Sequence, residues 1–173
     1  MSEPVVSIRP YRLGDAVDCY EAVMESMENL SAFSPWAHPN LTLEHQVAWV
    51  QSKVKAFEEQ SDFEFVILSA DGTFLGSCGL GQVDKVNRRA NLGYWVRSAA
   101  RRRGTATAAT RLLVKWGLEN TDLQRLEVIV STRNHPSLRV AEKAGASREG
   151  VLKSRLLLHG EWHDAAIYSF VRG

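Results

Sequence analysis

The sequence predicts a mixed α/β domain, with about seven strands in one sheet and about four flanking helices. Two observations lead to this fold class. Short apolar segments of strand character alternate along the chain with longer segments whose apolar residues recur every three to four positions. Their order is strand, helix, helix, three strands, helix, strand, helix and two strands. The central strand–helix–strand unit favours parallel pairing and the flanking strands favour antiparallel pairing, so the sheet should be mixed.

The first third of the chain predicts one strand and two helices. Residues 5–9 form the strand, and Asp15 is placed to cap the first helix. A proline-bounded loop at residues 34–40 precedes the second helix, which starts at Thr42. The expected apolar faces are Ala16, Tyr20, Val23 and Met27 on the first helix, and Val47, Val50, Val54 and Phe57 on the second.

Three strands follow in the middle of the chain. Residues 63–68 and 74–83 form a hairpin, because the Asp-Gly pair within residues 70–73 accepts the positive φ angles that a tight turn needs. A second turn at residues 87–89 leads into a strand at residues 90–96.

The last part of the chain alternates helices and strands. A helix follows Gly104, and a strand covers residues 125–131. Pro136 suits the first turn of a short helix that ends at Gly145. The inner face of the longer helix should be Ala106, Ala109, Leu113 and Trp116, and the final strands should be residues 151–158 and 162–171, joined at residues 159–160.

Composition limits the possible functions. The 173 residues suffice for a single domain, residues 1–173, and 45% hydrophobic with 24% charged residues is ordinary for a soluble protein. The net charge of +1 favours neither nucleic acid nor an anionic membrane as a partner. Cys19 and Cys78 lack metal-type spacing and are expected as reduced core residues. The sequence shows neither a signal peptide nor a membrane span, so we expect a cytoplasmic protein.

The most informative segment joins the strand at residues 90–96 to the helix after Gly104. Three arginines and a glycine here bring free backbone N–H groups, a helix dipole and fixed cations together, which predicts a site for a ligand with several phosphates. The spacing matches neither a Walker A loop nor a dinucleotide fingerprint. Two other interpretations stay open from the segment alone: a solvated basic turn, or a nucleic-acid patch that also uses Arg88 and Arg89.

Several motifs in order resemble the GNAT acetyltransferases. Residues 101–106 fit the Arg/Gln-x-x-Gly-x-Gly/Ala pattern of that family, between the expected strand and helix. The segments that resemble its RimJ/RimL branch, whose members acetylate ribosomal-protein N-termini or small amines, are residues 126–128, 134–137, 140–145 and 149–152, together with Pro35, Trp36 and Trp49. The resemblance covers nearly the whole chain.

This resemblance implies a GNAT fold that binds acetyl-CoA as co-substrate. The two parallel strands, residues 90–96 and 125–131, should splay apart and admit the pantetheine arm, and a backbone amide near residues 92–94 should face the acetyl carbonyl. The residues implied in CoA binding are Tyr94, Trp95, Val96, Arg101, Arg102, Arg103, Gly104, Thr105, Ala106, Thr107, Asn134, Ser137 and Lys143. Lys143 and Arg139 could equally lie on an exposed helix face.

The implied reaction is direct attack of a neutral amine on the thioester. Asn134 matches the residue that contacts the pantetheine arm, and Ser137 matches the hydroxyl that faces the departing sulfur. RimL-like enzymes often carry an acidic residue at the positions that match residues 154–157. This chain has no carboxylate there. The base could instead be one of Glu25, Glu28, His45, Glu64 and Glu127, acting through water.

The acceptor is expected to be a primary amine, most naturally a protein N-terminal α-amine. An α-amine has a pKa of about 8, against about 10.4 for a lysine, so far more of it is neutral at pH 7. Trp36 and His38 lie in the segment that lines the acceptor pocket of this family. The alternatives are a small-molecule amine acetyltransferase for antibiotics or polyamines, and a CoA-binding module without catalysis. We expect no metal, no nucleic acid and no membrane partner, and a homodimer is possible.

Overall fold

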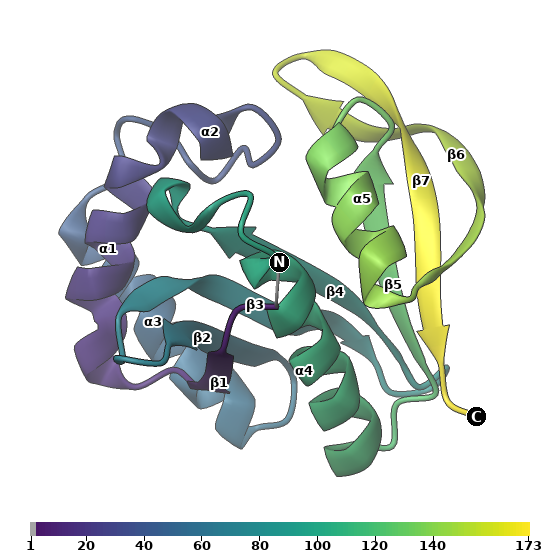
Figure 1. The fold of residues 1–173 in the computed structure, drawn as a ribbon, viewed down its shortest axis with the longest axis horizontal. Coiled ribbons are helices and arrows are strands. Elements are labelled where there is room, and N and C mark those ends of the chain that lie inside the picture. Colours follow the sequence, from purple (N-terminus) through teal and green to yellow (C-terminus); the bar gives the residue numbers. More distant parts are fainter. Residues whose placement is uncertain (1–2) are drawn as a thin grey trace.

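The computed structural model describes residues 3–173, and its strands form one seven-stranded mixed sheet. The strand order is β1-β2-β3-β4-β5-β7-β6 (Figure 1). The strands are β1 Val6–Pro10, β2 Phe63–Ser69, β3 Phe74–Asp84, β4 Arg89–Val96, β5 Arg125–Ser131, β6 Ser147–Leu158 and β7 Glu161–Val171. The prediction of a mixed α/β fold with about seven strands is confirmed.

Five α-helices and two short 3-10 turns accompany the sheet. They are η1 Leu13–Asp15, α1 Ala16–Glu25, α2 Met27–Ser31, α3 Leu43–Glu58, η2 Ser98–Ala100, α4 Thr105–Asn120 and α5 His135–Ala144. Figure 1 shows α4 and α5 on one face of the sheet and α1 with α3 on the other. Each face has its own apolar core, the first centred on Leu113 of α4 and the second on Val23 of α1 and Val50 of α3.

The first helix differs from its prediction in two ways. It breaks at Ser26, so Met27 belongs to the separate helix α2. Asp15 does not cap α1 with its side chain: its carboxylate accepts the Arg12 backbone N–H at 2.7 Å and pairs with the Arg9 guanidinium through two bonds of 2.8 Å. The ion pair therefore replaces the expected cap.

The second predicted helix begins at Leu43, one residue after its expected start, because Thr42 is its N-cap and accepts the His45 N–H, and one residue of its predicted apolar stripe is wrong. Val47 is exposed, and Gln46 takes the inward position beside it. The Gln46 amide donates to the Cys19 sulfur at 3.2 Å, so a hydrogen bond satisfies the buried polar group. Cys19 and Cys78 are both free and buried, as predicted.

The parallel pair β4–β5 separates soon after it forms. Only Arg89, Ala90 and Asn91 of β4 pair with β5, opposite residues 125–127, and both strands then continue without pairing each other. Figure 1 shows the two ribbons diverging toward the ends at which α4 and α5 begin. This confirms the splayed parallel pair that the family resemblance implied.

Two searches of residues 3–173 bear on possible partners. No helix in this range has the length and apolar character needed to cross a membrane. The same range contains no group of three or more histidine, cysteine, aspartate or glutamate side chains placed to hold a metal ion.

Candidate active site

A cleft of about 680 Å³ opens where β4 and β5 diverge. Its walls are the end of β4, the turn that starts α4, the first turns of α5 and the segment around α2. Of the predicted CoA-binding residues, Arg103 alone is absent from its lining. The fold therefore brings together residues that the sequence separates by more than 100 positions.

The turn before α4 has the backbone that phosphate binding requires. Arg102 and Gly104 both have positive φ, at 60° and 82°, and Gly104 is the N-cap of α4. The N–H groups of Thr105, Ala106 and Thr107 have no hydrogen-bond partner among the described residues. Unpaired amides at the positive end of a 16-residue helix form an anion site at the edge of the cleft.

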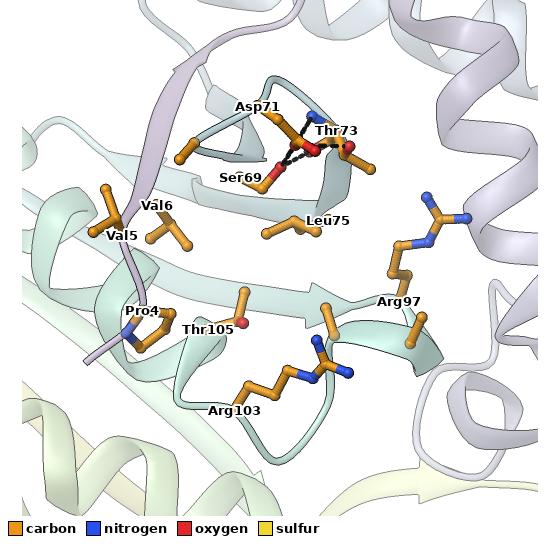
Figure 2. Close-up of a pocket in the computed structure, with 13 residues that line it drawn as sticks. Pro4, Val5, Val6, Ser69, Asp71, Thr73, Leu75, Arg97, Arg103 and Thr105 are labelled. Carbon is orange, nitrogen blue, oxygen red and sulfur yellow. Dashed lines mark hydrogen bonds between the residues drawn. The ribbon is translucent and has the colours of Figure 1, made fainter. Parts of the chain in front are cut away.

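The three arginines of this turn do not all lie at the same cleft. All are exposed, but only Arg101 and Arg102 line the cleft. Arg103 lies with Pro4 and Arg97 at a separate groove of about 610 Å³ between β1 and the turn (Figure 2). Only two of the three predicted cations are thus placed at the cleft.

The threonines and Lys143 also differ in exposure. Thr105 and Thr107 are buried, although both border the cleft. Arg139 and Lys143 are exposed on α5 and line the opposite wall. Their place beside the cleft fits contact with a phosphate at its mouth.

The start of α5 carries the two predicted catalytic positions. Asn134 is the N-cap of the helix, and its Oδ1 accepts the Ser137 backbone N–H at 3.4 Å. Its side-chain NH₂ has no partner within residues 3–173, so that group is available to a carbonyl in the cleft. Ser137 Oγ lies 2.9 Å from the hydroxyl of Tyr94 on β4.

Tyr94 therefore links the two walls of the cleft. Its single hydroxyl proton can go either to the Ser137 carbonyl, at 3.1 Å, or to Ser137 Oγ, and burial raises the pKa of this phenol to about 12. The group stays protonated at neutral pH and can act as a donor to Ser137. The resemblance named Tyr94 among the CoA-binding residues, but it gave no indication of this partner.

Helix α2 and its N-cap Ser26 are attached to η2 and to Arg101 by polar side chains that the sequence did not point to. The Ser26 hydroxyl accepts the Ser98 backbone N–H at 2.8 Å. Asn29 donates to the Ser98 hydroxyl at 2.8 Å, and its carbonyl accepts a hydrogen bond from Arg101. These contacts join segments 72 residues apart, and no local pattern predicts them.

The two predicted acceptor-side residues lie outside the lining of the cleft. Trp36 is 46% exposed and its ring lies 6.0 Å from that of Trp95, which does line the cleft. His38 is exposed. Trp36 thus extends the aromatic surface at the cleft edge.

The family follows from the comparison of the sequence with known proteins. Residues 6–147 match the model of the acetyltransferase (GNAT) domain. The chain belongs to the GNAT family of N-acetyltransferases. Among curated relatives, the protein named "Putative ribosomal N-acetyltransferase YdaF" of Bacillus subtilis is 26% identical over 168 residues, covering 96% of this chain and 91% of that one. The spermidine N(1)-acetyltransferase of Escherichia coli is 29% identical over 111 residues, covering 64% and 59%.

Solved structures agree with this assignment. The RimJ protein of Mycobacterium smegmatis, in complex with CoA-disulfide, is 28% identical with a TM-score of 0.86, and the match covers 97% of this chain and 82% of that chain. The RimL acetyltransferase for the ribosomal L7/L12 α-amine, in complex with coenzyme A, has a TM-score of 0.90 at 18% identity, covering 98% and 95%. At 18% identity, the RimL match shows the shared fold alone. The N-acetyltransferase is thus similar to RimJ/RimL-type proteins.

Proposed function

We propose that this N-acetyltransferase binds acetyl-CoA in the cleft and transfers the acetyl group to the α-amine of a protein N-terminus. The observation that carries the proposal is the turn at residues 101–107, whose unpaired amides face the same cleft as Ser137. A diphosphate on this turn would place a pantetheine arm in the gap between β4 and β5. The CoA complexes of the RimJ and RimL structures support this ligand.

The chemistry requires alignment and charge stabilisation, without a covalent enzyme intermediate. The amine attacks the thioester carbon, and a β4 amide beyond Asn91, where β4 no longer pairs with β5, stabilises the oxyanion. Ser137 donates a hydrogen bond to the departing sulfur, while Tyr94 donates to Ser137. The free Asn134 NH₂ holds a pantetheine carbonyl.

Two classes of acceptor are represented among the relatives. The YdaF and RimL names refer to ribosomal proteins, and the Escherichia coli relative is named for spermidine. We favour the α-amine because about one in ten such groups is neutral at pH 7, against about one in a few thousand for an amine of pKa 10.4. The YdaF match also covers nearly the full chain, whereas the spermidine match covers 64% of it.

A role in nucleic-acid binding finds no support in the placement of the arginines. Arg88 and Arg89 lie at the start of β4, and Arg101 follows its end. An eight-residue strand is about 25 Å long, so the two groups cannot form one compact patch. Arg89 is moreover paired with Asp84 and Glu127.

A thiol-release assay tests the proposal. Purified enzyme and acetyl-CoA are combined with an alanyl or seryl peptide, with the same peptide blocked at its N-terminus but carrying a lysine, or with spermidine. We expect fastest release with the free N-terminus. Faster turnover of spermidine would show that the preferred acceptor is a polyamine and not an N-terminal α-amine. Absence of CoA binding in calorimetry would rule out the proposed function.

A further inference from the structure

Glu64 occupies an unusual position in the middle of the sheet. It lies on β2 on the face covered by α1 and α3, opposite Gly79 of β3. The Ser77 hydroxyl donates to its Oε1 at 2.5 Å. A methyl group on Gly79 would lie 2.0 Å from its Oε2, so the carboxylate rests directly over the backbone of β3.

The next strand along this face is β4, at the segment where it lines the cleft. Ser77 is opposite Trp95, and Gly79 is opposite Gly93. Neighbouring strands are about 5 Å apart, so the Glu64 carboxylate lies one strand spacing from residues 93–95. Gly93 is exposed, with no described atom within 4 Å of the place a side chain would occupy. An acceptor therefore has room between the carboxylate and β4.

The surroundings of Glu64 disfavour its charged form. Burial raises the pKa of this carboxyl to about 7, against the opposing effects of the Ser77 hydrogen bond and the Lys53 charge on α3, while Asp62 raises it further. Tyr11 after β1 and Cys19 on α1 face it from the helical side, and burial raises the pKa of both. The side chain is nevertheless only half-buried, so solvent or substrate can reach it.

Other candidate bases are engaged elsewhere. Glu25 is bound to Arg97, and Glu127 lies between Arg89 and Arg125. His45 accepts the Thr42 backbone N–H in the cap of α3, and Asp164 binds Lys153 and the Ser154 N–H. Glu28 of α2 lines the cleft, so it is the other candidate base that the experiment must test.

We infer that Glu64 is the general base that takes the proton from the acceptor amine, directly or through one water. This rests on the proposed acetyl transfer and extends it. The nitrogen–carbon bond forms as the carbon–sulfur bond breaks. Glu64 accepts the proton that the nitrogen loses, and the sulfur leaves as a thiolate that accepts a hydrogen bond from Ser137. Proton exchange with water then returns Glu64 to its charged form and protonates the thiol, so the net change moves one proton from nitrogen to sulfur.

The test is the pH dependence of kcat/KM for an N-terminal peptide in the wild type and in Glu64→Gln. Both the amine and Glu64 must be deprotonated, so below pH 7 the wild-type value should fall about 100-fold per pH unit. Without the carboxylate the fall should be about tenfold per unit, and the rate at pH 7.5 should drop by about 10²–10⁴. Calorimetry should give an unchanged Kd for CoA.

Two further variants discriminate between roles. Ser77→Ala removes the donor that stabilises the carboxylate, so the apparent pKa of the acidic limb should rise by about one unit. An unchanged slope in Glu64→Gln overturns the assignment, as does a changed slope in Glu28→Gln instead. If Glu64→Gln fails to fold, the Ser77→Ala variant decides the question. An acidic limb with the same apparent pKa as in the wild type then overturns the assignment of Glu64. If wild-type enzyme releases no thiol from acetyl-CoA with any amine, the proposed function fails and this assignment falls with it.

Discussion

Substitution of Gly104 by alanine tests the role of the turn before α4. Gly104 has φ of 82°, where an L-residue costs about 1–2 kcal/mol. The new methyl group would also lie 3.2 Å from Pro4 Cδ, a tight contact. If the turn relieves this strain by moving, its amides leave the positions that bind the diphosphate. A loss of about 1–2 kcal/mol corresponds to a Kd for CoA about 5–30-fold higher.

Gly145→Ala provides the matched control. Gly145 is the C-cap of α5 with φ of 97°, and no described atom lies within 4 Å of the position its methyl group would take. It carries similar backbone strain but lies outside the cleft lining. Calorimetry with CoA and urea unfolding should show weaker binding for Gly104→Ala and mainly lower stability for Gly145→Ala. Equal effects of both variants on CoA affinity would refute the reasoning.

Three further predictions concern the polar contacts of the site. Tyr94→Phe removes the donor to Ser137 and keeps the ring, so kcat should fall while calorimetry gives an unchanged Kd for CoA; an unaltered kcat would contradict the link. Ser26→Ala leaves the Ser98 N–H without its partner, which should cost about 1–3 kcal/mol in urea unfolding, and a wild-type midpoint would argue against the contact. Folding raises the pKa of Glu64 from 4.5 to about 7, so the folded state holds this proton more tightly and its stability falls as pH rises between these values. Glu64→Gln should therefore be more stable than wild type at pH 8, by at most about 3 kcal/mol in urea unfolding, and a less stable variant there would contradict the pKa shift.

The parts of the fold that the sequence predicted are those determined locally. The turn at residues 70–73 and the alternation in residues 125–131 depend on neighbours within a few positions, and both are found in the structure. The cap at Thr42 is likewise a contact over three residues. The family motifs predicted that the turn at residues 101–107 and the start of α5 share one CoA site, and the structure brings both to one cleft.

The parts that the sequence did not predict depend on distant partners. The break at Ser26 contains neither glycine nor proline, and the hydroxyl of Ser26 is instead bound to the backbone of Ser98, 72 residues away. Asp15 was expected to act within its own helix but found a stronger partner in Arg9. A propensity that suits a cap gives way when tertiary structure offers a partly buried ion pair with two hydrogen bonds.

Glu64 shows how a polar residue in an otherwise apolar strand could have been recognised. Its neighbours Phe63, Phe65, Val66 and Ile67 are buried, and a carboxylate among them is costly unless it is paired or protonated. Within the described residues Glu64 has one hydroxyl donor and no ion pair closer than 4.0 Å. A group that lowers stability at neutral pH yet lies one strand from the proposed thioester site is best explained by a role in proton transfer. Both properties of this carboxylate have one cause, which is its partial removal from water. That removal lowers stability at neutral pH, and it also makes the group a suitable base.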